Sequence, residues 1–188
     1  QPDLVHVHCV NGFMVDVYKL FAFLKKNRIP TVITNHAEFF YTGSCSHAFE
    51  CERWKTGCGN CPQGFVATHC KLGDPTAAAY KKMKQAFAEL ENAAMISVSP
   101  WVGNRAAVSP ITAHIAQYVV LNGVNTKLFC LRDRMALREE LGIGMDEKVI
   151  FHPTAHFSDS EQDSKGGRFV LQLAKNLPMC KIIVAGNH

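Results

Sequence analysis

The feature of the sequence that most constrains its fold is an alternation between short apolar runs and longer amphipathic stretches. The runs are almost continuously apolar, as in strands that are buried on both faces of a sheet. Strands that alternate with amphipathic helices are typical of a parallel sheet covered by crossover helices. We therefore predict an α/β fold whose strands lie at Leu4–Cys9, Thr31–Thr34, Ala94–Val98, Gln117–Leu121, Lys148–Phe151 and Lys181–Ala185.

The stretches between these runs carry helical signals. Apolar residues recur at helical spacing between Gly12 and Pro30, both of which favour helix ends. Asp74 followed by Pro75 predicts the start of a second helix, because a carboxylate can cap the free amides and proline suits the first helical position. A third helix is expected after Gly166. The apolar stripes that should face inward are Phe13, Val17, Leu20, Phe21 and Leu24, then Tyr80, Met83, Phe87 and Leu90, then Phe169, Val170, Leu173, Ala174 and Leu177.

Composition and charge exclude several classes of protein. The formal net charge of +4 on 188 residues is too small and too scattered for a nucleic-acid-binding surface. No apolar run reaches the roughly 18 residues that span a bilayer, and no signal peptide is evident, so we expect a cytoplasmic protein. Lys81, Lys82 and Lys84 are interpreted as the solvated face of a helix. Contact of these lysines with anionic lipid, and so a peripheral position at the inner face of the membrane, is the alternative.

Four of the eight cysteines crowd into one stretch: Cys45, Cys51, Cys58 and Cys61. Two thiolates separated by two residues, as in Cys58 and Cys61, can bind one tetrahedral metal ion. We therefore predict a structural zinc ion at this site, where four cysteine ligands would leave no open position for water. Two disulfides, four free thiols, or His47 in place of one cysteine are the alternatives.

Two further positions are candidates for binding chemistry. His36 follows the second predicted strand, and ligands of open parallel sheets bind beyond the carboxyl ends of the strands. His8 ends the first strand, whereas His6 lies deeper in that strand and is interpreted as structural. Lys165 precedes two glycines that open a helix, so an ammonium group and free backbone amides could bind a phosphate together. A surface lysine at a loop tip is the alternative for Lys165.

Several segments also resemble glycosyltransferase family four, whose members have the two-domain GT-B fold. Asn122 belongs to a segment similar to the hinge between the two halves of that fold, and Lys165–Gly166 resembles the family's donor-phosphate loop. An insert at about 39–73 is similar to a cysteine-bearing insert of bacterial capsule and exopolysaccharide glycosyltransferases. The segments that carry the resemblance are Pro2–His8, Thr31–His36, Tyr41–Cys45, Trp54–Pro62, Ser97–Val102 and Val119–Phe129.

The resemblance implies two Rossmann-like halves, with residues 1–121 completing the acceptor half and 122–188 beginning the nucleotide-sugar donor half. It implies a retaining transfer of sugar to a saccharide or lipid-linked acceptor, without a catalytic metal. His36 would be catalytic, Lys165 and Gly166 would bind the donor phosphate, and His8 and Asn122 would support the cleft.

The sequence departs from the family pattern in two respects. The arginine that usually stands a few residues before the family's lysine is absent here. A family member would also have a glycine-rich strand before Gln1 and a paired-glutamate segment after His188, so the resemblance implies a fragment that is inactive alone. A zinc-ribbon binding module and a nucleotide-sugar epimerase of the same architecture are the alternative functions.

Overall fold

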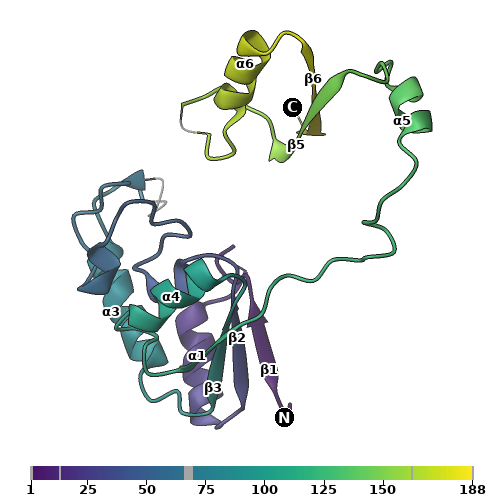
Figure 1. Cartoon of the computed structure of the whole chain (residues 1–188). Coiled ribbons are helices and arrows are strands. Elements are labelled where there is room, and N and C mark those ends of the chain that lie inside the picture. Colours follow the sequence, from purple (N-terminus) through teal and green to yellow (C-terminus); the bar gives the residue numbers. More distant parts are fainter. Residues whose placement is uncertain (1, 13, 66–69, 162, 188) are drawn as a thin grey trace. The chain divides into compact units, whose positions relative to one another are not determined.

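The computed structural model describes the chain except for residues 1, 13, 66–69, 162 and 188 (Figure 1). The chain forms two compact units, Gln1–Gly123 and Val124–His188. Each contains a parallel sheet. This confirms the expected α/β class with Rossmann-like, parallel-stranded parts. The acceptor and donor roles given to the two halves stay predictions.

The first unit is built on a four-stranded parallel sheet. Its strands lie side by side in chain order and correspond to the first four predicted runs. They are β1 (Val5–His8), β2 (Thr31–Asn35), β3 (Ala93–Ser97) and β4 (Ala116–Val119). Because all four strands are parallel, their carboxyl ends lie at one edge of the sheet, where candidate residues on separate strands can meet.

Three helices of this unit begin at capping side chains. In α1 (Val17–Lys26), the Asp16 carboxylate accepts from the amides of Tyr18 and Lys19. Just before α3 (Thr76–Phe87), Asp74 accepts from the Thr76 amide at 2.9 Å, as predicted, but Pro75 stands at the N-cap and Thr76, not Pro75, is the first helical residue. Ser99 caps α4 (Pro100–Val108). Such caps satisfy amides that have no partner within the helix.

The helices pack on one face of the sheet. Val7, Ile33 and Met95 are register neighbours on that face, and they are buried in one core with residues of α1 and α3. The predicted stripe of α3 is buried throughout, whereas Phe13 of the α1 stripe lies outside the described residues. On the opposite face Thr34 is buried, but the other side chains are exposed or half-buried, among them His6 and His8. The open face therefore carries the histidines of β1.

The cysteine-bearing insert shares this core. It contains two 3-10 helices, η1 (Phe39–Tyr41) and η2 (Arg53–Lys55). Tyr41 and Trp54 are fully buried, and their rings meet edge to face with centroids 5.5 Å apart. Both belong to the same hydrophobic cluster as Ile33 of β2. The insert is thus anchored in the α/β unit by aromatic residues.

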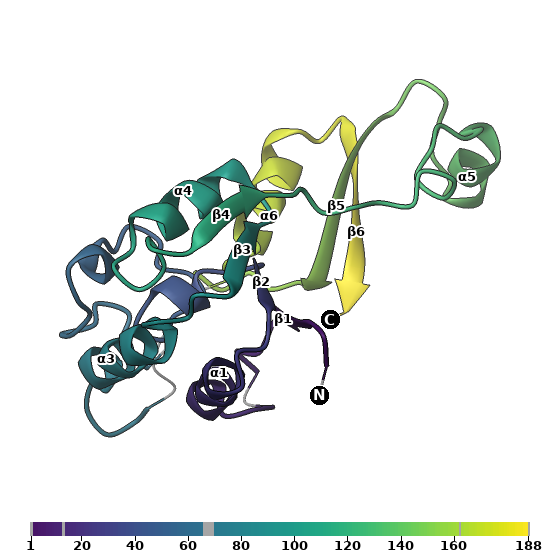
Figure 2. The ribbon, with the colours of Figure 1, turned by 90° about the horizontal axis from the view of Figure 1, so that it is seen from below.

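The second unit contains α5 (Met135–Glu140), β5 (Lys148–His156), α6 (Gly167–Asn176) and β6 (Cys180–Asn187). Strands β5 and β6 run side by side and in parallel, and α6 packs against β6 (Figure 2). The expectation that the whole apolar stripe of α6 faces inward is wrong for this unit. Val170 is buried, but Phe169 is 55% and Leu173 is 41% exposed, because two strands cover only a narrow strip of the helix.

Among the described residues, no helix is both long enough and apolar enough to cross a bilayer.

Candidate functional site

Two predicted site histidines meet at the carboxyl edge of the first sheet. His8 ends β1 and pairs in register with Thr34 of β2, while His36 follows β2 directly. The Nδ1 atom of His8 lies 3.0 Å from Nε2 of His36, within hydrogen-bond distance. One ring must donate its N–H to the other, so the neutral pair holds a proton between the two imidazoles. The parallel topology therefore brings together the two histidines that the sequence placed at strand ends.

His6 is a third member of this cluster. Its ring centroid lies 4.0 Å from that of His8, and its Nε2 atom lies 2.8 Å from the Thr34 hydroxyl. Desolvation of the ring lowers the pKa of His6 below its usual value, and the positive charges of His8 and His36 lower it further. A His6 ring that resists protonation holds its hydrogen bond to Thr34 and packs beside His8. These contacts agree with the structural role predicted for His6.

The lowered pKa of His6 predicts how stability depends on pH. The unfolded chain, with a histidine pKa of 6.5, binds the proton before the folded chain as the pH falls. Stability is therefore greatest above the unfolded pKa and is lost as the pH falls through the lower folded value. We expect His6→Asn to flatten the decrease in melting temperature between about pH 7.5 and 5.5. His47→Asn, at an exposed position, is the control and should leave that decrease unchanged.

The segment that leaves β1 is shaped around this edge. Cys9 has a φ of 43°, a left-handed conformation that costs a residue with a side chain about 1 kcal/mol. The Asn11 side-chain amide then donates to the Ser46 hydroxyl at 2.8 Å, which ties this segment to the insert. A small pocket beside His36 is lined by Cys9, Asn11, Thr34 and Phe39, among others. The edge thus offers a recess next to the histidine pair.

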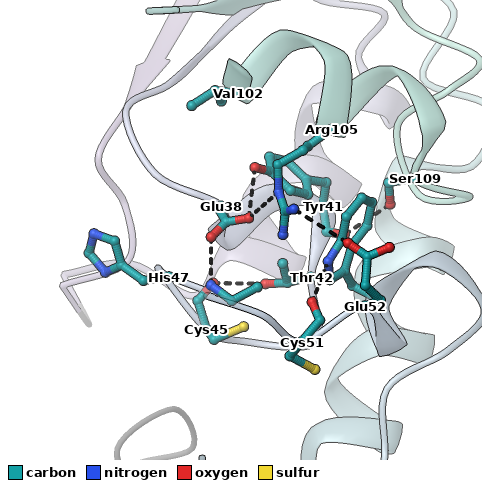
Figure 3. A network of polar contacts seen from close by, with 12 residues as sticks. Glu38, Tyr41, Thr42, Cys45, His47, Cys51, Glu52, Val102, Arg105 and Ser109 are labelled. Carbon is teal, nitrogen blue, oxygen red and sulfur yellow. Dashed lines mark hydrogen bonds and ion pairs between the residues drawn. The ribbon is translucent and has the colours of Figure 1, made fainter.

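A buried ion pair joins the segment that follows His36 to α4 (Figure 3). The Glu38 carboxylate is 3% exposed and lies 2.7 Å from Nε of Arg105, a residue of α4. It also accepts hydrogen bonds from the Tyr41 hydroxyl at 3.2 Å and from the Ala48 amide at 2.5 Å. Arg105 makes a second, longer ion pair with Glu52 at 3.6 Å. These contacts fix the segment after β2, and the insert, to α4.

Aromatic side chains complete the surroundings of Arg105. Its guanidinium carbon lies 4.7 Å from the ring centroids of both Trp54 and Trp101, in cation–π geometry. Burial, followed by the negative charge of Glu38, raises the pKa of Tyr41, so its hydroxyl keeps the proton that it donates to Glu38. The sequence reading did not single out Glu38 or Arg105. The one local signal was a carboxylate within the mostly apolar stretch Ala37–Tyr41.

The four predicted zinc ligands line one small cavity, although they come from different parts of the insert. All four are free cysteines. Burial is the main reason why the pKa of Cys58 is raised to about 11; the neighbouring thiols also raise the pKa, whereas a hydrogen bond from the Gly43 amide lowers it. In the part of the chain that the structure describes, no three histidine, cysteine, aspartate or glutamate side chains are already arranged to hold a metal ion. Zinc binding therefore stays a prediction for Cys45, Cys51, Cys58 and Cys61.

The predicted phosphate-binding residues lie in the second unit, at the start of α6. Gly166 has a φ of 78°, and a Cβ on Gly167 would lie 2.1 Å from the Ser158 carbonyl oxygen, so both positions require glycine. The Asp163 carboxylate accepts from the amides of Lys165 and Gly167 at 3.0 and 3.1 Å. These two amides already have an anionic partner. The exposed ammonium group of Lys165 is then the group best placed to meet a phosphate.

Asn122 is exposed beyond the end of β4. It does not belong to the described lining of the pocket beside His36. Its supporting role at the hinge stays a prediction.

Comparison with known proteins gives one informative similarity. No protein-family model matches the chain. In an alignment of 66 residues that covers 32% of its length, the chain is 33% identical to the putative colanic acid biosynthesis glycosyl transferase WcaC of Escherichia coli (strain K12). The match covers 16% of that protein's length. About a third of this chain is therefore similar to a small part of a glycosyl transferase.

Proposed function

We propose that this chain is part of a glycosyltransferase that moves a sugar from a nucleotide-sugar donor to a saccharide or lipid-linked acceptor. The observation that carries the proposal is the contact of His8 with His36 at the carboxyl edge of a parallel sheet, in a chain similar to a glycosyl transferase. The reaction would retain the anomeric configuration and would serve cell-surface polysaccharide synthesis. It would take place in the cytoplasm, at the inner face of the membrane when the acceptor is lipid-linked.

The chemistry requires a charged leaving group to be stabilised. The bond between the anomeric carbon and the donor diphosphate breaks, a bond from that carbon to an acceptor hydroxyl oxygen forms, and the hydroxyl proton must be taken up. An imidazole can donate a hydrogen bond to a departing diphosphate oxygen or orient the acceptor hydroxyl. We assign this part to His36. His8, at 3.0 Å, orients the His36 ring and accepts or supplies the shared proton.

The insert supports this edge of the sheet. The Asn11–Ser46 hydrogen bond holds the segment that leaves β1, and the Glu38–Arg105 ion pair holds the segment that follows His36. Trp54 and Tyr41 belong to the core of the α/β unit, which argues against an independent zinc-ribbon module as the function of the chain. Positioning of this kind matters because small displacements of a catalytic group reduce the rate strongly.

In the donor half, we propose that Lys165 binds the diphosphate of the nucleotide sugar. Lys165→Ala is then expected to weaken binding of a nucleoside diphosphate about tenfold or more, because a charge-assisted contact to phosphate is lost. Binding of the corresponding nucleoside should change by less than about twofold, since it has no phosphate. Isothermal titration calorimetry on protein expressed from its native reading frame measures both affinities.

Lys175→Ala is the matched control, since Lys175 lies in the last turn of the same helix, and it should leave both affinities unchanged. Equal losses for diphosphate and nucleoside in Lys165→Ala, or no loss in either, would remove Lys165 from the phosphate site.

A further inference from the structure

The four cysteines of the insert enclose a space of a particular size. Cys45 and Cys51 come from the segment before η2, and Cys58 and Cys61 from the segment after it. All four line one cavity of about 20 Å³. A volume of this kind accommodates roughly one water-sized sphere. The occupant that fits is therefore a single atom or ion.

The backbone between Cys58 and Cys61 is bent so that both side chains reach this cavity. Gly59 has a φ of 141° and Asn60 a φ of 49°, both in the region that glycine favours. The Cys61 amide donates to the Asp74 carboxylate at 2.7 Å, and Asp74 also caps α3. The bend is thus fixed to the start of a helix.

The other two cysteines are held through their main chains. The Thr42 hydroxyl donates to the carbonyl oxygen of Cys45 at 2.8 Å. The indole N–H of Trp54 donates to the carbonyl oxygen of Cys51 at 2.9 Å. Neither contact uses the sulfur atom. The thiols of Cys45 and Cys51 can turn about their Cα–Cβ bonds while their backbones stay in place, and the Cys45 thiol exchanges its hydrogen bond with the Thr42 side chain when it turns.

Gly43 closes the cavity on a further side. A Cβ atom there would lie 2.7 Å from Cβ and 2.9 Å from Sγ of Cys58, so the main chain is packed directly against this thiol. The Gly43 amide donates a hydrogen bond to Cys58. Donors of this kind orient a metal-bound ligand from outside the coordination sphere.

We propose that Cys45, Cys51, Cys58 and Cys61 together bind one structural zinc ion. Rotation of the side chains brings four sulfur atoms to about 2.3 Å from the ion in tetrahedral geometry. Each thiol gives its proton to solvent, so four protons leave and a Zn(S-Cys)₄ centre with a net charge of −2 forms. No electron is transferred, and four protein ligands leave no position for water or substrate.

A bound zinc ion accounts for the four cysteines around one cavity better than two disulfides or four free thiols do. Two disulfides would need an oxidant that removes four electrons, and they would not hold the four side chains around one point. Four free thiols would leave an insert of mostly irregular structure that is held by aromatic anchors and polar contacts but has no cross-link. The ion would join the two parts of the insert that lie before and after η2. The Asn11–Ser46 hydrogen bond then ties this cross-linked insert to the segment that leaves β1 near His36.

The test is the metal content of the purified chain. Protein expressed in a cytoplasm, with zinc in the medium, and purified without chelator is analysed by inductively coupled plasma mass spectrometry. We expect about one zinc per chain, with Cys58→Ser and Cys61→Ser each falling below about a tenth of an equivalent. Cys130→Ser changes an exposed cysteine of the other unit and should keep the full equivalent. Zinc removal should also lower the melting temperature of the parent protein and of Cys130→Ser alike.

If the serine variants fail to fold, the proposed zinc site is tested on the parent protein alone. Replacement of its zinc by cobalt should give the visible absorption of a tetrahedral thiolate-bound ion. Less than about a tenth of an equivalent of zinc in folded parent protein would overturn the proposal, whether thiol titration after denaturation finds these cysteines free or oxidised. So would full zinc content in both serine variants. Neither result bears on sugar transfer, which is measured separately.

Discussion

Glu38→Gln is expected to lower the free energy of unfolding of the first unit by about 3 kcal/mol, because it leaves the mostly buried charge of Arg105 with only the longer ion pair to Glu52. The Arg105 side chain is 16% and the Glu38 side chain 3% exposed, so water cannot replace the lost carboxylate. The two tryptophans that stack on the guanidinium cannot accept its hydrogen bonds. Urea denaturation, followed by circular dichroism, measures the loss.

Glu91→Gln is the matched control for this prediction, since Glu91 is exposed and its replacement should change stability by less than about 0.5 kcal/mol. The double variant Glu38→Gln with Arg105→Met should be more stable than Glu38→Gln alone, because it removes the guanidinium charge that has lost its closer partner. A loss in Glu38→Gln no greater than in Glu91→Gln would show that the ion pair does not hold the insert to α4.

His36→Ala is expected to reduce kcat for sugar transfer by about 10²- to 10³-fold in protein expressed from its native reading frame. The affinity for the nucleotide sugar should change much less, because the proposed contact strengthens as the diphosphate departs. Steady-state kinetics and calorimetry separate the two effects. The substitution should leave the fold intact, since His36 is exposed and lies outside the hydrophobic core.

His114→Ala gives the control for His36, because His114 is a histidine of the same unit that bonds the Phe87 carbonyl oxygen away from the cluster. It should retain kcat. His8→Ala should reduce kcat less than His36→Ala does, since it removes the orienting partner only. Transfer at the parent rate by His36→Ala would take His36 out of the mechanism.

Most of the fold could be predicted because its signals are local. Runs of apolar residues marked the strands, and Asp74 marked the start of α3, since a strand or a cap needs only near neighbours in the chain. The meeting of His8 and His36 followed from one further inference, that parallel strands place their carboxyl ends together. The prediction that Phe169 of α6 faces inward was wrong, because helical spacing defines a face without showing how much of the sheet covers it.

The Glu38–Arg105 pair could not be predicted from sequence. The two residues are 67 positions apart, on different elements, and neither belongs to a motif. Only the folded chain brings α4 over the segment that follows β2. The cysteines show a related limit, because their spacing predicted a shared site but not which main-chain contacts would hold it.

The most direct test of the proposed function is transfer of labelled sugar. Protein expressed from its native reading frame, with any flanking sequence, is incubated with a panel of nucleotide sugars and with oligosaccharide and lipid-linked acceptors from a polysaccharide-producing bacterium. We predict a labelled, lengthened acceptor with one donor, loss of that product in His36→Ala, and no product from residues 1–188 alone, because sites of this kind close around both substrates. Folded protein that binds a nucleotide sugar but yields only its epimer, or no product from any donor, would contradict the assignment as a glycosyltransferase.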